Sequence, residues 1–133
     1  FTPRSEEAID RARRLAGADA EISLLHCWEL GSQTMNWEAD GKSLRDILEQ
    51  ENEERGRDLL TRLGDQRLTF RQRRADPREG ILDELEQNPY DLAVVGSHGR
   101  SGLEKLLLGS VAEAVMKHAK VPVYVARKQA PVL

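Results

Sequence analysis

Short apolar runs alternate with longer segments of helical pattern along the whole chain, and this alternation restricts the possible folds strongly. The apolar runs cover 20–30, 67–75, 92–95 and 121–126, and the helical segments cover 3–16, 42–63, 77–87 and 110–120. A helix between two consecutive strands is the crossover that parallel pairing requires. The sequence therefore predicts the α/β fold class, with an open parallel sheet and helices on both faces.

Three segments carry more detailed predictions. The polar segment 31–41 is predicted to be a loop, with Met35 and Trp37 at its tip. Pro122 removes a backbone donor, so the last strand is predicted to be an edge strand or to begin late. The helical pattern of 110–120 predicts an inward face made of Val111, Ala112, Val115, Met116 and Ala119.

The length of the chain and the distribution of its charges limit the classes of protein to which it can belong. A chain of 133 residues predicts a single domain over 1–133. Its 20 basic and 23 acidic residues are mixed along the sequence, which argues against a nucleic-acid-binding face. No apolar run approaches the roughly 18 residues of a membrane-spanning helix, so we expect no membrane insertion. The single cysteine excludes an internal disulfide and fits a reducing compartment, so we expect a cytoplasmic protein.

One stretch combines a buried strand, a glycine-rich turn and the start of a helix. The strand 92–95 runs into Gly96-Ser97-His98-Gly99-Arg100-Ser101, and Gly109-Ser110 then opens the last helix. Backbone N–H groups of such a turn can approach an anion closely, and a helix start adds further donors. In parallel sheets, ligands bind beyond the carboxyl ends of the strands, where this turn lies. The stretch therefore predicts a phosphate-binding site.

Each part of this pattern also has a purely structural explanation. A Gly-x-x-Gly turn after a strand is often only a turn. Ser110 and Glu113 fit a capping box, in which Ser110 would accept a hydrogen bond from the Glu113 amide. His98 and Arg100 fit exposed loop positions, and Cys27 fits a buried small hydrophobe.

Catalytic patterns do not stand out in the sequence. We find no paired carboxylates, no Ser-His-Asp arrangement with a nucleophile elbow and no metal-ligand spacing among three histidines and one cysteine. The glycine-rich loop also lacks the Gly-Lys-Ser/Thr ending of a Walker A loop. The site is therefore predicted to hold a nucleotide rather than to turn it over, because phosphoryl transfer needs such groups around the phosphate.

The chain resembles the universal stress protein family over nearly its whole length. The ATP-binding branch of that family carries the pattern Gly-x2-Gly-x9-Gly-Ser/Thr, which this chain matches completely between Gly96 and Ser110. The strand 24–27, Leu-Leu-His-Cys, resembles the family's second strand, and the ending Val-Pro-Val-Tyr-Val at 121–125 resembles its last. The resemblance implies a Rossmann-like sheet of the adenine nucleotide alpha hydrolase type, with strand order 3-2-1-4-5.

The resemblance also implies a ligand and its contacts. The ligand would be ATP, with or without Mg²⁺, lying across the carboxyl ends of the strands. Phosphates and ribose would contact Gly96, Gly99, Gly109 and Ser110. The loop would be lined by Ser97, His98, Arg100 and Ser101, and the backbone of Cys27 would meet the adenine.

Two departures from the family pattern carry expectations of their own. Ala75 stands where the family usually has glycine, which we expect to change one turn only. The family's first strand, which ends in an Asp that contacts the nucleotide, would stand just before Phe1. That strand is central in the implied order, and its loss would cost far more than the roughly 5–15 kcal/mol net stability of a domain. We therefore expect residues upstream of Phe1, or another segment in that place.

Three functions are compatible with these observations. The leading hypothesis is an ATP-binding, nucleotide-responsive stress-response module that is not a fast enzyme. The second is a slow ATP hydrolase or adenylate-handling protein, and the third is a dimerising interaction module that binds no nucleotide. The apolar edge strand 121–125 predicts a homodimer, because a short exposed strand is a template for symmetric pairing.

Overall fold

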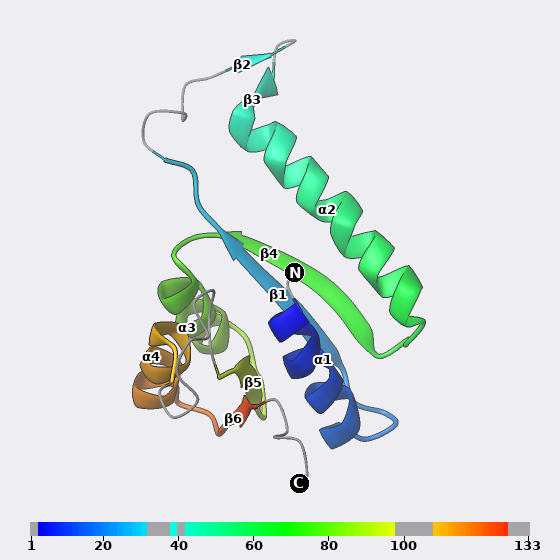
Figure 1. The fold of residues 1–133 in the computed structure, drawn as a ribbon, viewed down its shortest axis with the longest axis vertical. Helices are drawn as coiled ribbons and strands as arrows, with labels where there is room; N and C mark the ends of the chain where they lie inside the picture. Colours follow the sequence, from blue (N-terminus) through cyan, green and yellow to red (C-terminus); the bar gives the residue numbers. More distant parts are fainter. Residues whose placement is uncertain (1–2, 32–37, 40–41, 98–107, 128–133) are drawn as a thin grey trace, which may run out of the picture. The chain divides into compact units, whose positions relative to one another are not determined.

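A computed structural model describes residues 3–31, 38–39, 42–97 and 108–127. The chain divides into two compact units. The middle unit is Ala18–Asp76, and the terminal unit combines Phe1–Gly17 with Pro77–Leu133. Helices and parallel strand pairs make up both, so the predicted α/β class is confirmed (Figure 1).

The middle unit is built on two parallel strands and one long helix. Strand β1 (Ile22–Trp28) pairs with β4 (Leu68–Arg74), residue for residue from Ile22↔Leu68 to Trp28↔Arg74. Helix α2 (Leu44–Leu63) connects them and lies along the pair (Figure 1). The buried apolar side chains of this unit are Ile22, Leu24, Leu59 and Leu68.

Both ends of α2 are capped by residues suited to that position. The Ser43 hydroxyl accepts a hydrogen bond from the Asp46 amide at 3.2 Å, which satisfies one of the orphan donors of the first turn. Gly64 follows the helix with φ 62°, a left-handed conformation in which its N–H donates to the Leu60 carbonyl. The helix therefore begins two residues later than the sequence predicts and ends where predicted.

The segment before α2 is not entirely a loop. Strand β2 (Glu38–Ala39) pairs antiparallel with β3 (Lys42–Ser43). The prediction of a loop over 31–41 is wrong at these two positions, because strands of two residues are too short to show an alternating pattern. Met35 and Trp37 lie outside the described residues.

The terminal unit has two parallel strands between helices. It contains α1 (Pro3–Leu15), α3 (Pro77–Gln87), β5 (Ala93–Gly96), α4 (Ser110–His118) and β6 (Val123–Ala126). Strands β5 and β6 pair from Ala93↔Val123 to Gly96↔Ala126. Helix α4 contacts β6 and packs on α3, and Figure 1 draws α1 on the other side of the strands from α4. The late start of β6, after Pro122, agrees with the prediction.

The core of the terminal unit lies under α4. Val95, Ala112 and Val115 are buried there, and side chains of α3, α4 and β6 pack around them. Met116 is half-exposed, so its predicted place on the inward face is wrong. Val115 and Ala112 already fill the narrow stripe that α4 buries, and Met116 lies beside it.

Two of the neighbour relations in the expected strand order are present. The pair β4–β1 corresponds to positions 3-2 of that order, and the pair β5–β6 corresponds to positions 4-5. The order across all strands stays a prediction. Among the described helices, none has the length and apolar character needed to span a bilayer.

Candidate functional site

The carboxyl end of β5 carries the first half of the glycine motif. Gly96 is the last residue of the strand, and Ser97 follows it with its side chain buried. The Ser97 amide donates to the Ala126 carbonyl at 2.9 Å, which extends the pairing of β5 and β6 by one residue. The strand end is therefore anchored on the side facing β6.

The second half of the motif is tied to the first by one hydrogen bond. The Gly109 amide donates to the Ser97 carbonyl at 2.7 Å. Twelve positions separate these residues in the sequence, yet the bond places the start of α4 directly beside the end of β5. The structure thus brings Gly96, Ser97, Gly109 and Ser110 close together.

The start of α4 does not form the capping box that was the structural explanation for Ser110 and Glu113. Gly109 is the N-cap, with φ −64° and ψ 158°, and no side chain makes a capping hydrogen bond there. The Glu113 amide donates to the Gly109 carbonyl, and the Glu113 carboxylate lies 2.9 Å from the Lys117 ammonium. Ser110 is the first residue of the helix and is exposed. The N-cap is thus one residue earlier than in the capping-box explanation, because glycine also serves as an N-cap.

This arrangement leaves backbone donors at the helix start. The amides of Ser110, Val111 and Ala112 come before the first helical hydrogen bond, so they have no acceptor within the helix. They lie at the positive end of the helix dipole. None of the four motif residues in the described part of the chain is titratable. The geometry of these described residues suits the holding of an anion.

The remaining predicted residues fall into two groups. His98, Gly99, Arg100 and Ser101 lie outside the described residues. Cys27 lies in β1, in the middle unit, and is half-buried, whereas the structural explanation had it as a buried small hydrophobe. Neighbouring His26 is also half-buried, and this burial lowers the pKa of its imidazole. Among the described residues, no three His, Cys, Asp or Glu side chains gather as a metal site.

Comparison of the sequence with models of protein families identifies the family to which this chain belongs. The family model described as "Universal stress protein family" matches residues 1–127. The chain belongs to the universal stress protein family. Universal stress protein G of Shigella flexneri is 31% identical over 128 residues, which cover 92% of this chain and 89% of the relative. The resemblance identified from the motifs is therefore confirmed.

Other relatives match over shorter stretches. Universal stress protein MJ0531 of Methanocaldococcus jannaschii is 48% identical over 52 residues, which cover 39% of this chain and 31% of the relative. Less than a third of that relative's length is thus matched by this universal stress protein chain. The activity and partners of that whole relative are therefore not attributed to this chain.

Solved structures support the same fold. The structure of MJ0577 superimposes with a TM-score of 0.74 at 26% identity, covering 98% of this chain and 92% of that chain. A universal stress protein family protein from Arabidopsis thaliana, solved with AMP bound, superimposes with a TM-score of 0.55 at 25% identity. That match covers 96% of this chain and 77% of the Arabidopsis chain.

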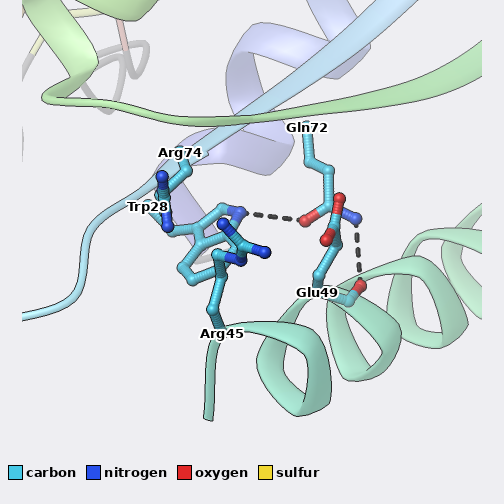
Figure 2. Close-up of a pocket in the computed structure, with 5 residues that line it drawn as sticks. All are labelled: Trp28, Arg45, Glu49, Gln72 and Arg74. Carbon is cyan, nitrogen blue, oxygen red and sulfur yellow. Dashed lines mark hydrogen bonds between the residues drawn. The ribbon is translucent and has the colours of Figure 1, made fainter. Parts of the chain in front are cut away.

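Two features of the structure were not predicted from the sequence. One is the role of Ser97, whose backbone joins both halves of the motif. Its position directly after a buried strand was the available signal. The other is a polar pocket in the middle unit, lined by Trp28, Arg45, Glu49, Gln72 and Arg74 (Figure 2). Its residues come from three elements whose register no local pattern shows.

Proposed function

We propose that this universal stress protein binds ATP or a related adenine nucleotide at the glycine motif and acts as a nucleotide-responsive stress-response module. The complete Gly-x2-Gly-x9-Gly-Ser pattern supports this proposal. So does the AMP bound to the Arabidopsis family member. The module would respond to nucleotide occupancy rather than consume ATP quickly.

The hydrogen bond from Gly109 to the Ser97 carbonyl carries the proposal. It holds the helix start, whose first amides have no acceptor within the helix, at the carboxyl end of β5, where ligands of parallel sheets bind. Phosphate oxygens would accept from the amides of the first turn of α4. The Ser110 hydroxyl is exposed and makes no capping bond, so it is available to the same phosphates.

The backbone at Gly109 supports the same interpretation. Its φ of −64° and ψ of 158° are accessible to every amino acid, so chain geometry does not require glycine there. Lack of a side chain at a helix N-cap permits close approach of a ligand to the backbone. A nucleotide phosphate is the group that we propose to make this approach.

The remaining contacts and the assembly complete the proposal. Adenine would meet the backbone at Cys27, and the loop residues His98, Gly99, Arg100 and Ser101 would enclose the phosphates. Two copies would pair through the edge strand that contains Val123 and Val125, forming a homodimer. Both side chains of this pair are half-buried in the single chain.

The test is ATP affinity in the variant Gly109→Val, measured by calorimetry with and without Mg²⁺. A valine side chain would occupy the space of the phosphates, so we expect affinity to fall about tenfold or more, a change of about 1.4 kcal/mol. ATP should also raise the thermal midpoint of the wild type and leave that of the variant unchanged.

Gly17→Val is the matched control. Gly17 is exposed, and a Cβ added there would meet nothing within 4 Å. The control should bind ATP as the wild type does. Undiminished ATP affinity in a folded Gly109→Val protein would refute the assignment of the site.

A further inference from the structure

The middle unit contains a polar pocket, of about 310 Å³, that the glycine motif does not explain. Trp28 and Arg74 are the paired last residues of β1 and β4, and Arg45 and Glu49 come from the first turns of α2. The pocket therefore lies at the carboxyl end of this strand pair, on the side covered by α2 (Figure 2). Its volume is at the small end of the range for ligand pockets, about 300–1,000 Å³.

The indole of Trp28 is held in one orientation by Gln72. Its Nε1 donates to the Gln72 Oε1 at 2.9 Å (Figure 2). The Gln72 Nε2 in turn donates to the Glu49 carbonyl at 3.0 Å and to the Glu53 carboxylate at 2.8 Å. With both its N–H groups and its oxygen bonded, Gln72 fixes the ring against α2. The wall of the pocket is thus a preorganised aromatic surface.

Two guanidinium groups border this ring. Arg74 has no carboxylate partner among the described residues, and its side chain is exposed. The Arg45 Nε lies 3.6 Å from the Asp46 Oδ1, but both side chains are half-exposed, so that ion pair is weak. Arg45 can therefore leave Asp46 to bind another anion. Guanidinium groups bind phosphates and carboxylates through paired N–H donors. Glu49 limits the net positive charge, which favours an anion of low charge.

We propose that this pocket binds a small organic oxyanion, with its phosphate or carboxylate between Arg45 and Arg74 and a planar ring against Trp28. The pocket residues all belong to the middle unit, and none is part of the glycine motif. The pocket is therefore proposed as a binding site separate from the motif, and competition with ATP tests this separation.

The experiment follows Trp28 fluorescence in a Trp37→Phe background, which leaves one tryptophan in the chain. Phenyl phosphate and benzoate are the probes, inorganic phosphate tests the anion without the ring, and phenol tests the ring without the charge. We expect phenyl phosphate or benzoate to change the fluorescence saturably. Inorganic phosphate and phenol should each bind about tenfold more weakly or worse, because each lacks one of the two contacts.

Variants of the two pocket arginines test whether their side chains bind the anion. Arg74→Gln and Arg45→Gln should each weaken the binding of the charged probes about tenfold, the effect of one lost charge-assisted contact. Arg57→Gln, an exposed change elsewhere on α2, should leave binding unchanged. These arginines are exposed, so the variants are expected to fold.

Separate outcomes decide this inference and the proposed function. Probe binding that persists in Gly109→Val and under saturating ATP supports a second site, whatever the fate of ATP binding. The proposal is overturned if the charged probes give no saturable response. It is also overturned if the arginine variants bind like the wild type, or if ATP displaces the probe completely.

Discussion

Gly56 shows how a single residue fits α2 to its strand pair. It lies in the highly charged middle of the helix, yet it is buried against Phe70 of β4. A Cβ built on Gly56 would lie 2.4 Å from Cγ and from Cδ1 of the Phe70 ring. Glycine is thus required here for close packing, although it weakens an isolated helix by about 1 kcal/mol relative to alanine.

The variant Gly56→Ala is therefore expected to destabilise the protein. Overpacking typically costs about 1–3 kcal/mol, which exceeds the gain in helix propensity of about 1 kcal/mol. Urea unfolding measures the difference, with Glu54→Ala, an exposed change in the same helix, as the control. An increase in stability for Gly56→Ala would show that Phe70 moves aside freely.

His26 predicts a dependence of stability on pH. Burial lowers the pKa of its imidazole below 6.5 in the folded state, so the unfolded chain takes up the proton at a higher pH. This contribution to stability is complete above about pH 6.5 and is lost as the pH falls through the folded pKa. Urea midpoints across this range should fall toward acid in the wild type and fall less in His26→Gln. Parallel pH profiles for the two proteins would contradict this origin.

At the scale of elements, the starts of α2 and α4 contrast in their caps. Ser43 accepts a bond from the Asp46 amide, whereas at α4 glycine is the N-cap and the serine follows it. The sequence predicted both helices from their apolar periodicity, and it predicted the start of α3 from Asp76-Pro77. It could not decide between Gly109 and Ser110 as the N-cap, because both residue types occupy that position.

Two serine variants test this contrast. Ser43→Ala removes a capping bond and should lower the free energy of unfolding by about 1 kcal/mol. Ser110→Ala removes no capping bond, so stability should stay within about 0.5 kcal/mol, while ATP affinity falls. Thermal unfolding and calorimetry provide the two measurements. Equal destabilisation by both changes would mean that the Ser110 hydroxyl caps α4 after all.

At the scale of the whole molecule, the strand pairs were more predictable than their assembly. Apolar runs identified β1, β4, β5 and β6, and the two neighbour relations follow the expected order. The relation between the pairs depends on contacts distant in sequence, which local patterns do not encode. The same limit applies to the site. The motif predicted a site between the end of β5 and the start of α4, but the hydrogen bond through the Ser97 carbonyl is a tertiary feature that the motif does not show.

At this scale we predict that two copies of the chain pair through β6. Tyr124 is 37% exposed on β6, and Met116 is 50% exposed on α4. Sedimentation should show a wild-type dimer that dissociates in Tyr124→Asp, because the change places charge on the pairing strand. Met116→Asp adds the same charge elsewhere and should remain dimeric. A wild type that stays monomeric at high concentration would exclude this interface.

The backbone of Ser97 also links the start of α4 to strand β6. Its amide donates to the Ala126 carbonyl of β6, and its carbonyl accepts from the Gly109 amide at the start of α4. A ligand that shifts the start of α4 would displace the carbonyl of a residue whose amide holds the outer strand. If the motif binds nucleotide as proposed, its occupancy would thus be coupled to the geometry of β6 across one amino acid.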